Sequence, residues 1–214
     1  MKRVFAFIQA RMSSKRLPGK VLMKINGKTI IGHIVLKLKK IRNLNKVIIV
    51  TSIDKTDDVI DEYCKKKNIE VFRGDLDNVY KRYYDAIKYY DINSILRITC
   101  DSPLISEDMV NDGINIFKKN QFDIVSNTLL RSYPKGQSFE IFKSSIILNN
   151  FKNIKIQSEK EHLTGFFYKN KNKFKIFNKL NKEKIISKNL SIDTMKDFKF
   201  ISDNFNKLSK IKYI

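Results

Sequence analysis

Short apolar runs alternate with amphipathic stretches through the first 126 residues. Five runs of three to six residues have the composition of buried strands, and they cover residues 4–9, 47–51, 70–72, 94–99 and 123–126. An apolar period near 3.6 residues predicts helices over 29–41, 56–67, 76–90 and 107–119, the last opened by Ser106 as N-cap. This alternation predicts an α/β fold with a Rossmann-like, mostly parallel sheet covered on both faces.

The last third of the chain is less regular. It predicts an antiparallel strand over 138–142, a helix over 158–169, strands over 174–177 and 190–192, and a helix from Thr194. No repeat and no linker rich in Pro, Gly or Ser divides the chain. We therefore expect a single domain over 1–214, with a small antiparallel elaboration at about 130–190.

The chain is strongly basic, with a formal net charge of +21 in 214 residues. Such a charge can indicate a polyanion partner. However, 35 of the 43 basic residues are Lys, and the excess is spread along the chain, at +10 over 1–140 and +11 over 141–214. No stripe of alternating aromatic and basic residues is present to stack bases. Compositional bias explains the charge better than a nucleic-acid surface, which we keep as a remote alternative.

Cysteine use and hydropathy indicate a compartment. Cys64 and Cys100 lie far apart, without a CxxC pair, which argues against a disulfide framework or a structural zinc site. No apolar run approaches the ~20 residues of a membrane span. The run 4–8 is too short for a signal peptide core. We expect a soluble, cytoplasmic protein with no membrane partner.

In parallel sheets, ligands bind beyond the carboxyl ends of the strands. The first strand runs into a loop, residues 9–20, that contains Arg11, Lys15, Arg16 and Lys20. These cations, with backbone N–H groups of residues 12–14, could surround a triphosphate. The loop is not a Walker A motif, because Val21 follows the Gly-Lys pair. The alternative is a basic surface loop.

Two carboxylates end short apolar runs further along the chain. Asp101 follows the run 94–99 and precedes Pro103, and Asp193 follows the run 190–192. Mg²⁺ prefers one or two carboxylates together with substrate phosphates, so the pair predicts a metal-dependent phosphoryl or nucleotidyl transfer site. The alternatives are that Asp101 caps a turn and that Asp193 is the N-cap of the helix from Thr194.

Weaker indications complete the candidate set. Arg73 lies in a turn after the third strand and could approach a base or phosphates. A polar loop and its surroundings could meet an acceptor through Arg131, Tyr133, Glu140 and His162. His33 falls inside the first helix, where a structural role is expected.

The motifs together resemble a known family. Residues 6–24 (AFIQARMSSKRLPGKVLMK), 72–75, 97–105 (RITCDSPLI), 131–142, 161–164 and 190–197 match, in order, the motifs of cytidylyltransferases. The similarity points to the spore-coat polysaccharide biosynthesis and acylneuraminate cytidylyltransferase-like branch. It implies the nucleotide-diphospho-sugar transferase fold, often as a homodimer.

The resemblance also implies a reaction and roles for residues. A sugar hydroxyl attacks the α-phosphorus of CTP and pyrophosphate leaves, which makes a CMP-sugar for surface polysaccharide synthesis. The nucleotide-binding residues implied are Gln9, Ala10, Arg11, Met12, Ser13, Ser14, Lys20 and Arg73. Arg11, Lys20 and Asp101 form the catalytic set, and Asp101 and Asp193 hold Mg²⁺ as cofactor.

One position departs from the family pattern. Ser138 stands where relatives usually carry an acid, two residues before Glu140. The resemblance places this loop at the acceptor, which we expect to be a nonulosonic or related ketosugar acid. The alternatives are another nucleotide or a polyol-phosphate acceptor on the same fold. The sequence does not identify the general base.

Overall fold

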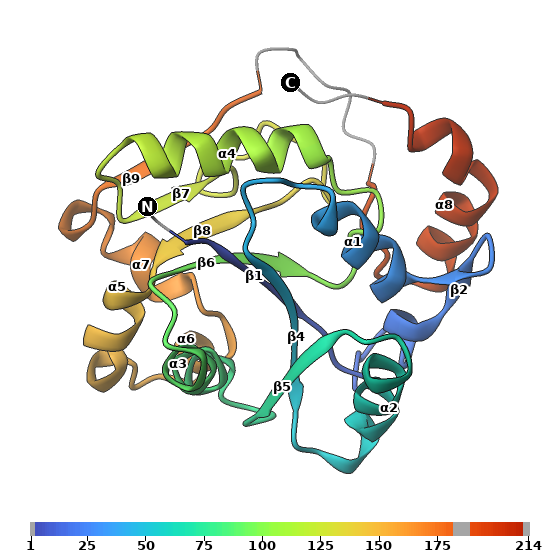
Figure 1. The fold of residues 1–214 in the computed structure, drawn as a ribbon, viewed down its shortest axis with the longest axis horizontal. Coiled ribbons are helices and arrows are strands. Elements are labelled where there is room, and N and C mark those ends of the chain that lie inside the picture. Colours follow the sequence, from blue (N-terminus) through green and yellow to red (C-terminus); the bar gives the residue numbers. More distant parts are fainter. Residues whose placement is uncertain (1–2, 182–188, 212–214) are drawn as a thin grey trace.

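The computed structural model describes residues 3–181 and 189–211 (Figure 1). Within these ranges seven strands form one sheet in the order β5-β4-β1-β6-β8-β7-β9. They are β1 (Phe5–Gln9), β4 (Lys46–Ser52), β5 (Glu70–Gly74), β6 (Ser94–Thr99), β7 (Ile124–Ser126), β8 (Glu140–Lys143) and β9 (Ile176–Asn178). The five strands predicted in the first 126 residues are confirmed.

The sheet is parallel at its centre and mixed at one side. β1 pairs in parallel with β4 and β6, and β4 pairs in parallel with β5. β8 runs antiparallel between β6 and β7, and β9 pairs in parallel with β7. The predicted Rossmann-like sheet with a small antiparallel part is therefore confirmed.

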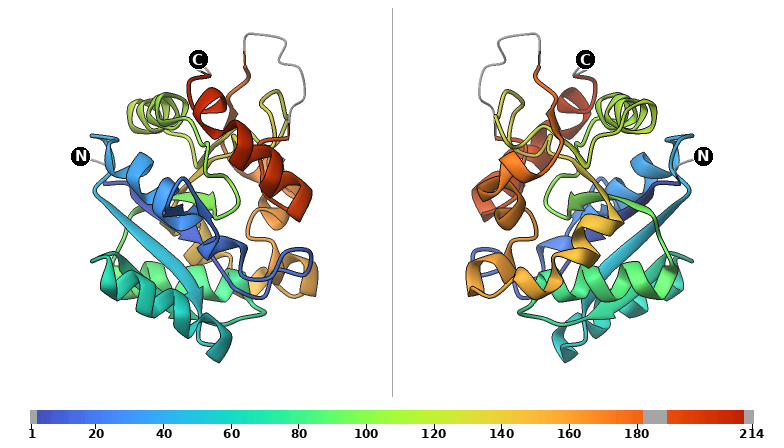
Figure 2. Two further views of the ribbon diagram at one scale, coloured as in Figure 1. Left: turned by 90° about the vertical axis from the view of Figure 1, so that its right-hand side faces the viewer. Right: turned by 90° about the vertical axis from the view of Figure 1, so that its left-hand side faces the viewer.

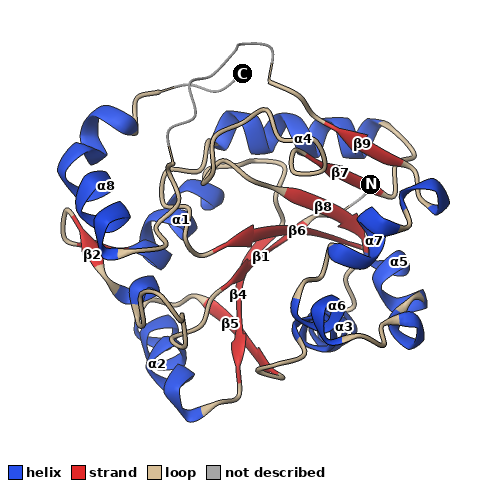
Figure 3. Ribbon diagram, turned by 180° about the vertical axis from the view of Figure 1, so that it is seen from behind, coloured by secondary structure: helices blue, strands red, loops and turns tan. Residues whose placement is uncertain are grey.

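Helices cover both faces of the sheet (Figure 3). They are α1 (Ile30–Lys39), α2 (Asp58–Lys66), α3 (Val79–Tyr90), α4 (Glu107–Lys119), α5 (Ser144–Asn149), α6 (Gln157–Glu161), α7 (Gly165–Lys169) and α8 (Met195–Leu208). Apolar residues of α1, α2, α4 and α8 pack in one core, and those of α3, α5 and α7 pack in a second core. Adjacent residues of β1 divide between the two, Ala6 and Ile8 facing the first core and Phe7 the second.

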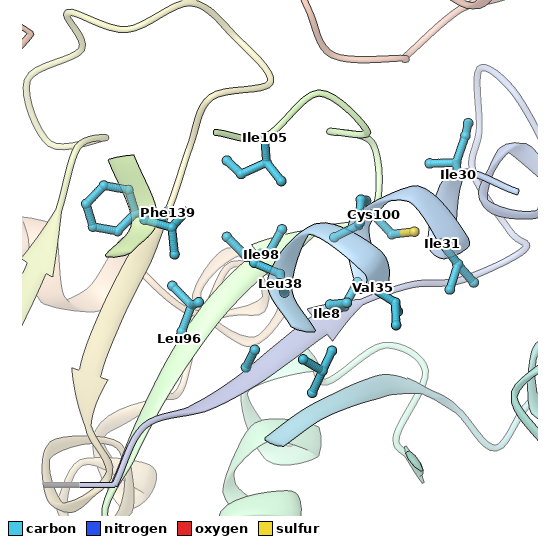
Figure 4. Packing of buried hydrophobic residues seen from close by; sticks show 14 of the residues in the cluster. Ile8, Ile30, Ile31, Val35, Leu38, Leu96, Ile98, Cys100, Ile105 and Phe139 are labelled. Atoms are coloured by element: carbon cyan, nitrogen blue, oxygen red, sulfur yellow. The ribbon is translucent and has the colours of Figure 1, made fainter. Parts of the chain in front are cut away.

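The first core shows the period-3.6 pattern directly. Ile31, Val35 and Leu38 of α1 lie on the helix face that packs above Ile8 and Ile98 (Figure 4). Helix α8 packs against the same core through Ile201, Phe205 and Leu208 (Figure 2). The Phe205 ring lies 4.5 Å from that of His33. The Nε2 atom of His33 also bonds to the Ile25 carbonyl at 2.8 Å, which confirms its structural role.

Two local predictions differ from the structure, and one hairpin was not predicted. The helix expected over 158–169 is split into α6 and α7 at His162. The strand expected over 190–192 is wrong, because this segment takes no strand pairing and instead donates single backbone bonds from Leu190 and Ile192. A hairpin, β2 (Lys24–Ile25) and β3 (Lys28–Thr29), was not predicted, although its Asn26-Gly27 turn is a typical hairpin signal.

Cysteine and hydropathy predictions are consistent with the fold. Cys64 and Cys100 are both free and buried, and burial raises the pKa of the Cys64 thiol to about 12. In the described part of the chain, no helix combines the length and apolar character needed to cross a bilayer.

Candidate active site

Two adjoining cavities open at the carboxyl ends of the central strands. The loop cavity, about 530 Å³, is lined by Gln9, by residues of the loop that follows it, and by His162. The strand cavity, about 420 Å³, is lined by Arg97, Thr128, Arg131, Lys135, Glu140 and Tyr168, among others. Thr99, Asp101 and Asp193 line both cavities and so mark their junction.

The loop over residues 9–20 is folded onto itself around Met12. The Met12 carbonyl accepts hydrogen bonds from the N–H groups of Ser14 and Gly19, both at 2.9 Å. Gly19 has a φ of 72°, a left-handed conformation that glycine adopts without strain. The N–H group of Met12 donates to Asp57 Oδ1 at 2.7 Å. The loop is thus a fixed structure and not a freely moving surface segment.

This geometry corrects one expectation about the loop. The N–H groups of residues 12–14 were expected to contact phosphate oxygens, but those of Met12 and Ser14 are used inside the protein. Among residues 12–14, only the N–H group of Ser13 makes no hydrogen bond to a residue in the described ranges. Ser14 and Ala10 line the loop cavity, whereas Met12 and Ser13 do not. The cavity-facing donors are therefore mainly side chains.

Asp57, a residue that sequence reasoning missed, anchors the loop. Its carboxylate is completely buried and accepts bonds from Met12 N, Thr51 Oγ1, and the N and Oγ of Ser52. It therefore ties the loop after β1 to the end of β4. Nothing in the sequence distinguishes Asp57 from the neighbouring acids Asp54 and Asp58, because the loop residue that it anchors, Met12, lies 45 residues away along the chain.

Four cations line the loop cavity, as predicted. Arg11, Lys15 and Arg16 are exposed, and the Lys20 side chain is only 11% exposed. Lys20 Nζ donates to the Ile192 carbonyl at 2.6 Å and to Asp193 Oδ1 at 3.0 Å. Arg16 reaches Asp193 Oδ2, also at 3.0 Å. Lys20 and Arg16 therefore hold the Asp193 carboxylate between them.

The two acids lie at the junction, and the alternative role of Asp193 is not supported. Thr194 caps α8 in a reciprocal capping box with Asp197, so Asp193 is not the cap. Asp101 Oδ1 accepts bonds from the hydroxyls of Thr99 and Ser102, at 2.7 and 2.8 Å. The N–H of Ile192 donates to the Asp101 carbonyl at 2.8 Å. This bond holds the two acid-bearing segments side by side.

The other nucleotide candidate, Arg73, is held away from the cavities. Its Nε donates to the Ser52 carbonyl at 2.9 Å, and its Nη2 reaches the Asp54 carbonyl and the Asp58 carboxylate. It lines neither the loop cavity nor the strand cavity. In this conformation Arg73 joins the end of β5 to the turn after β4.

The four acceptor candidates lie in different parts of the structure. Arg131 and Glu140 line the strand cavity, and His162 lines the loop cavity. Tyr133 is 2% exposed, packs in the first core and lines neither cavity, so the expectation that its ring faces an acceptor is not supported. Its place in the core follows from the polar loop folding back over α4, which the sequence did not reveal.

In the strand cavity, Glu140 is surrounded by three polar residues that sequence reasoning missed: Arg97, Thr128 and Tyr168. Arg97 Nη1 donates to Glu140, whose other oxygen accepts from Thr128 Oγ1 at 3.0 Å and from the Tyr168 hydroxyl at 2.9 Å. Burial raises the pKa of Tyr168 above its ordinary value, and the nearby Glu140 carboxylate adds to this. Arg97 and Glu140 were within matched motifs, but their contact depends on a strand order that the sequence does not show.

A mostly parallel sheet, a cation-bearing loop after its first strand and two carboxylates where two cavities meet are the features expected of a Rossmann-like nucleotidyltransferase. The chain belongs to the cytidylyltransferase family, whose family model matches residues 5–213. This confirms the family indicated by the sequence motifs.

Individual relatives match most of the chain. An uncharacterized protein of Methanocaldococcus jannaschii is 38% identical over 202 residues, which covers 92% of this chain and 81% of that protein. The spore coat polysaccharide biosynthesis protein SpsF of Bacillus subtilis is 27% identical over 154 residues, with coverage of 70% and 62%.

Solved structures agree with the fold. A cytidylyltransferase from Leptospira borgpetersenii serovar Hardjo-bovis has a TM-score of 0.92 at 32% identity, covering 97% of this chain and 88% of that one. A CMP:2-keto-3-deoxy-manno-octonic acid synthetase, solved with CTP, has a TM-score of 0.74. At 13% identity, with 96% and 99% coverage, it is similar in fold alone.

Proposed function

We propose that this protein transfers CMP from CTP to an acidic sugar and releases pyrophosphate. The observation that carries the proposal is the pair of cavities that meet at Asp101 and Asp193. The loop cavity offers four cations to a triphosphate. The strand cavity offers Arg131 and Lys135 to an anionic acceptor, beside polar hydroxyls. The names of SpsF and of the fold neighbour agree with a product for glycan synthesis.

The residues of the chain act by positioning and by neutralising charge. In the proposed reaction the acceptor hydroxyl loses its proton to solvent and its oxygen bonds to the α-phosphorus of CTP, while the bond from that phosphorus to the pyrophosphate oxygen breaks. Negative charge then grows on the phosphate oxygens, where Arg11 and Lys20 would stabilise it. Lys20 is well suited because its nearly buried ammonium is held in place by Ile192 and Asp193.

The donor set at the junction fits Mg²⁺. In the described ranges no three His, Cys, Asp or Glu residues cluster into a complete metal cage. Mg²⁺ does not require one, because it is usually held by one or two carboxylates plus substrate phosphates and water. Asp101 and Asp193, held side by side, would supply those carboxylates. The ion would neutralise charge on the transferring phosphate.

The decisive experiment measures pyrophosphate release with Mg²⁺ for each of the four ribonucleoside triphosphates. Each is paired with a panel of nonulosonic acids, other ketosugar acids and polyol phosphates. Release with CTP and a sugar acid supports the proposal, while release with another nucleotide or with a polyol phosphate identifies the alternative. CTP binding in calorimetry without release would keep the nucleotide and reject the acceptor class. An absence of CTP binding would reject the proposal.

A single substitution tests the metal assignment. Asp101→Asn should lower Mg²⁺-dependent turnover by roughly 100-fold or more, because a metal ligand contributes several kcal/mol to transition-state stabilisation. The matched control is Asp91→Asn at the exposed C-terminal end of α3, which should keep full turnover. Unchanged turnover in folded Asp101→Asn protein would refute the metal role.

Two further expectations stay predictions. The resemblance indicates a homodimer, which sedimentation equilibrium would test. The composition indicates a cytoplasmic protein, which cell fractionation would test.

A further inference from the structure

A row of polar side chains crosses neighbouring strands on one face of the sheet. Arg97 of β6 is paired in register with Glu140 of β8, which is paired with Ser126 of β7. On the other side, Arg97 is in register with Phe7 of β1, and Gln9 lies two residues further along that strand, on the same face. The polar row therefore extends from Gln9 to Ser126.

The row separates apolar core from open cavity. One register step further from the cavities on the same face lie Phe5, Ile95, Phe142 and Ile124; the last three belong to the second core, and Phe5 packs against it. Two residues forward along β6 is Thr99, at the junction of the cavities. Apolar side chains would fill the core equally well at the positions of this row. The polar side chains there therefore indicate a function in the cavities.

Arg97 joins the two halves of the row. Its Nε and Nη2 both donate to Gln9 Oε1, at 3.2 and 3.1 Å. Its Nη1 donates to Glu140 Oε2. The side chains of Arg97 and Glu140 are 15% and 4% exposed, so water competes little for these bonds. Gln9 lines the loop cavity and Glu140 the strand cavity, so the contact links the two.

These contacts determine which way the Gln9 amide points. A guanidinium group has only donors, so the amide atom that faces Arg97 must be the oxygen. The Nε2 group of Gln9 is then directed away from Arg97, and it has no hydrogen bond to any residue in the described ranges. An oriented but unused donor thus lies in the wall of the loop cavity.

The positive charge of Arg97 is fixed by its surroundings. Burial lowers the pKa of Arg97, but the facing Glu140 carboxylate outweighs burial and raises the pKa above its ordinary value. Glu140 accepts bonds from Thr128 and Tyr168 as well, so its oxygens are occupied inside the protein. A carboxylate with these partners is suited to hold neighbours in place and not to move a proton.

We propose that Arg97 and Glu140 are positioning residues, which hold Gln9 so that its Nε2 group donates a hydrogen bond to the nucleotide. The partner is a hydrogen-bond acceptor of the nucleoside triphosphate in the loop cavity. The inference rests on the proposed function, because it takes the loop cavity as the nucleotide site.

Calorimetric binding of CTP, without an acceptor, tests the role of Gln9. Gln9→Glu still offers oxygens to Arg97 but has no donor, and Gln9→Met has neither donor nor charge. We expect CTP to bind at least tenfold more weakly to Gln9→Glu and about fivefold more weakly to Gln9→Met. The unfolding temperature of Gln9→Glu should not fall below that of the unmodified protein. Gln121→Glu, an exposed position, is the matched control and should bind CTP normally.

The two Gln9 variants separate donor loss from charge repulsion. If only Gln9→Glu weakens binding, repulsion explains the result and the donor role is overturned. If both bind CTP normally, the inference fails while the proposed function stands. If the unmodified protein binds none of the four ribonucleoside triphosphates, the proposed function and this inference both fail.

A double-mutant cycle tests the positioning role of Arg97. Arg97→Lys keeps a charge opposite Glu140, but one ammonium group cannot replace the two bonds to Gln9 Oε1. We expect Arg97→Lys to weaken CTP binding three- to tenfold in the unmodified protein. In the Gln9→Met variant, the same substitution should not weaken CTP binding any further. An equal loss in both backgrounds would mean that Arg97 acts only structurally. If Arg97→Lys does not fold, the Gln9 variants still decide the donor role.

Discussion

Two ion pairs at the site differ in how they are built. Arg97 and Glu140 face each other from adjacent strands and are 15% and 4% exposed. Lys20 and Asp193 come from a loop and from the segment before α8, and are 11% and 28% exposed. Asp193 also pairs with Arg16, whose side chain is 67% exposed. Both pairs line a cavity, but the Glu140 carboxylate is also bonded to Thr128 and Tyr168 and is buried, whereas the Asp193 carboxylate is 28% exposed.

This difference indicates that the Arg97–Glu140 pair is a permanent part of the scaffold. The contacts of Asp193 with Lys20 and Arg16 can instead be exchanged for contacts with a ligand. A buried carboxylate with several donors has no better partner than the protein, so Arg97 and Glu140 should stay together in every state. Asp193 and the two cations that hold it line the loop cavity, where a triphosphate would compete for the cations and a metal for the carboxylate.

The largest effect should come from removing Glu140. Glu140→Ala leaves Arg97 as a buried cation without its counter-ion, which should lower the free energy of unfolding by about 3–5 kcal/mol. Asp193→Asn removes a carboxylate that is 28% exposed, against 4% for Glu140, and should cost less, about 1 kcal/mol. Urea denaturation of both variants measures the difference. Equal losses would show that burial does not distinguish the two pairs.

The loop anchor should be nearly as important as the scaffold pair. Asp57→Ala deletes a buried acceptor of four hydrogen bonds and should lower the free energy of unfolding by roughly 2–4 kcal/mol. It should also weaken CTP binding, because Met12 loses its attachment to the end of β4. Asp54→Ala, which removes exposed bonds to Thr56, is the matched control and should cost about 1 kcal/mol or less. A stable Asp57→Ala protein with normal CTP affinity would show that the loop needs no anchor.

The sequence predicted the loop side of the site better than the strand side. Residues 9–20 are contiguous, so their four cations could be recognised without knowledge of the fold. The Arg97–Glu140 contact depends on β8 running antiparallel between β6 and β7, an order that hydrophobic periodicity does not encode. For the same reason Thr128 and Tyr168 were missed, and Tyr133 was expected at the acceptor although it packs in the core.

The segment around Asp193 shows a different kind of failure. Leu190 and Ile192 are apolar, which predicted a strand, but both are buried in the first core without strand pairing. The N–H groups of Leu190 and Ile192 donate one bond each, to the carbonyls of Lys135 and Asp101. The position of Asp193 was therefore predicted correctly as the end of an apolar run, while the structure that holds it was not.

Gly136 should be essential for holding that segment. It has a φ of 87°, and a Cβ atom there would lie 2.3 Å from the Leu190 carbonyl oxygen. Gly136→Ala should lower the free energy of unfolding by about 1–3 kcal/mol and reduce turnover, because the segment that carries Asp193 must move. Gly27→Ala is the matched control, with a φ of 76° but open space around the Cβ position. It should cost about 1 kcal/mol and leave turnover unchanged. Equal turnover in the two variants would mean that Asp193 does not depend on this packing.

The smallest effect, and the sharpest test of exchange, concerns CTP binding without metal. In the absence of ligand, Asp193 neutralises Lys20 and Arg16, the cations that a triphosphate would need. Asp193→Asn removes this competitor, so metal-free CTP should bind about two- to tenfold more tightly in the presence of EDTA. Lys20→Ala should shift the affinity in the opposite direction.

The sign of this shift distinguishes the two kinds of ion pair more directly than stability does. A carboxylate that only supported the loop would make binding weaker when removed, as we expect for Asp57. A carboxylate that occupies the phosphate cations must make metal-free binding tighter, even though turnover with Mg²⁺ falls. Calorimetry at constant ionic strength measures the shift, since added salt would screen these charges. If Asp193→Asn bound metal-free CTP more weakly or equally well, Asp193 would be a scaffold residue like Glu140. Its ion pairs with Lys20 and Arg16 would then not be exchanged for contacts with the triphosphate.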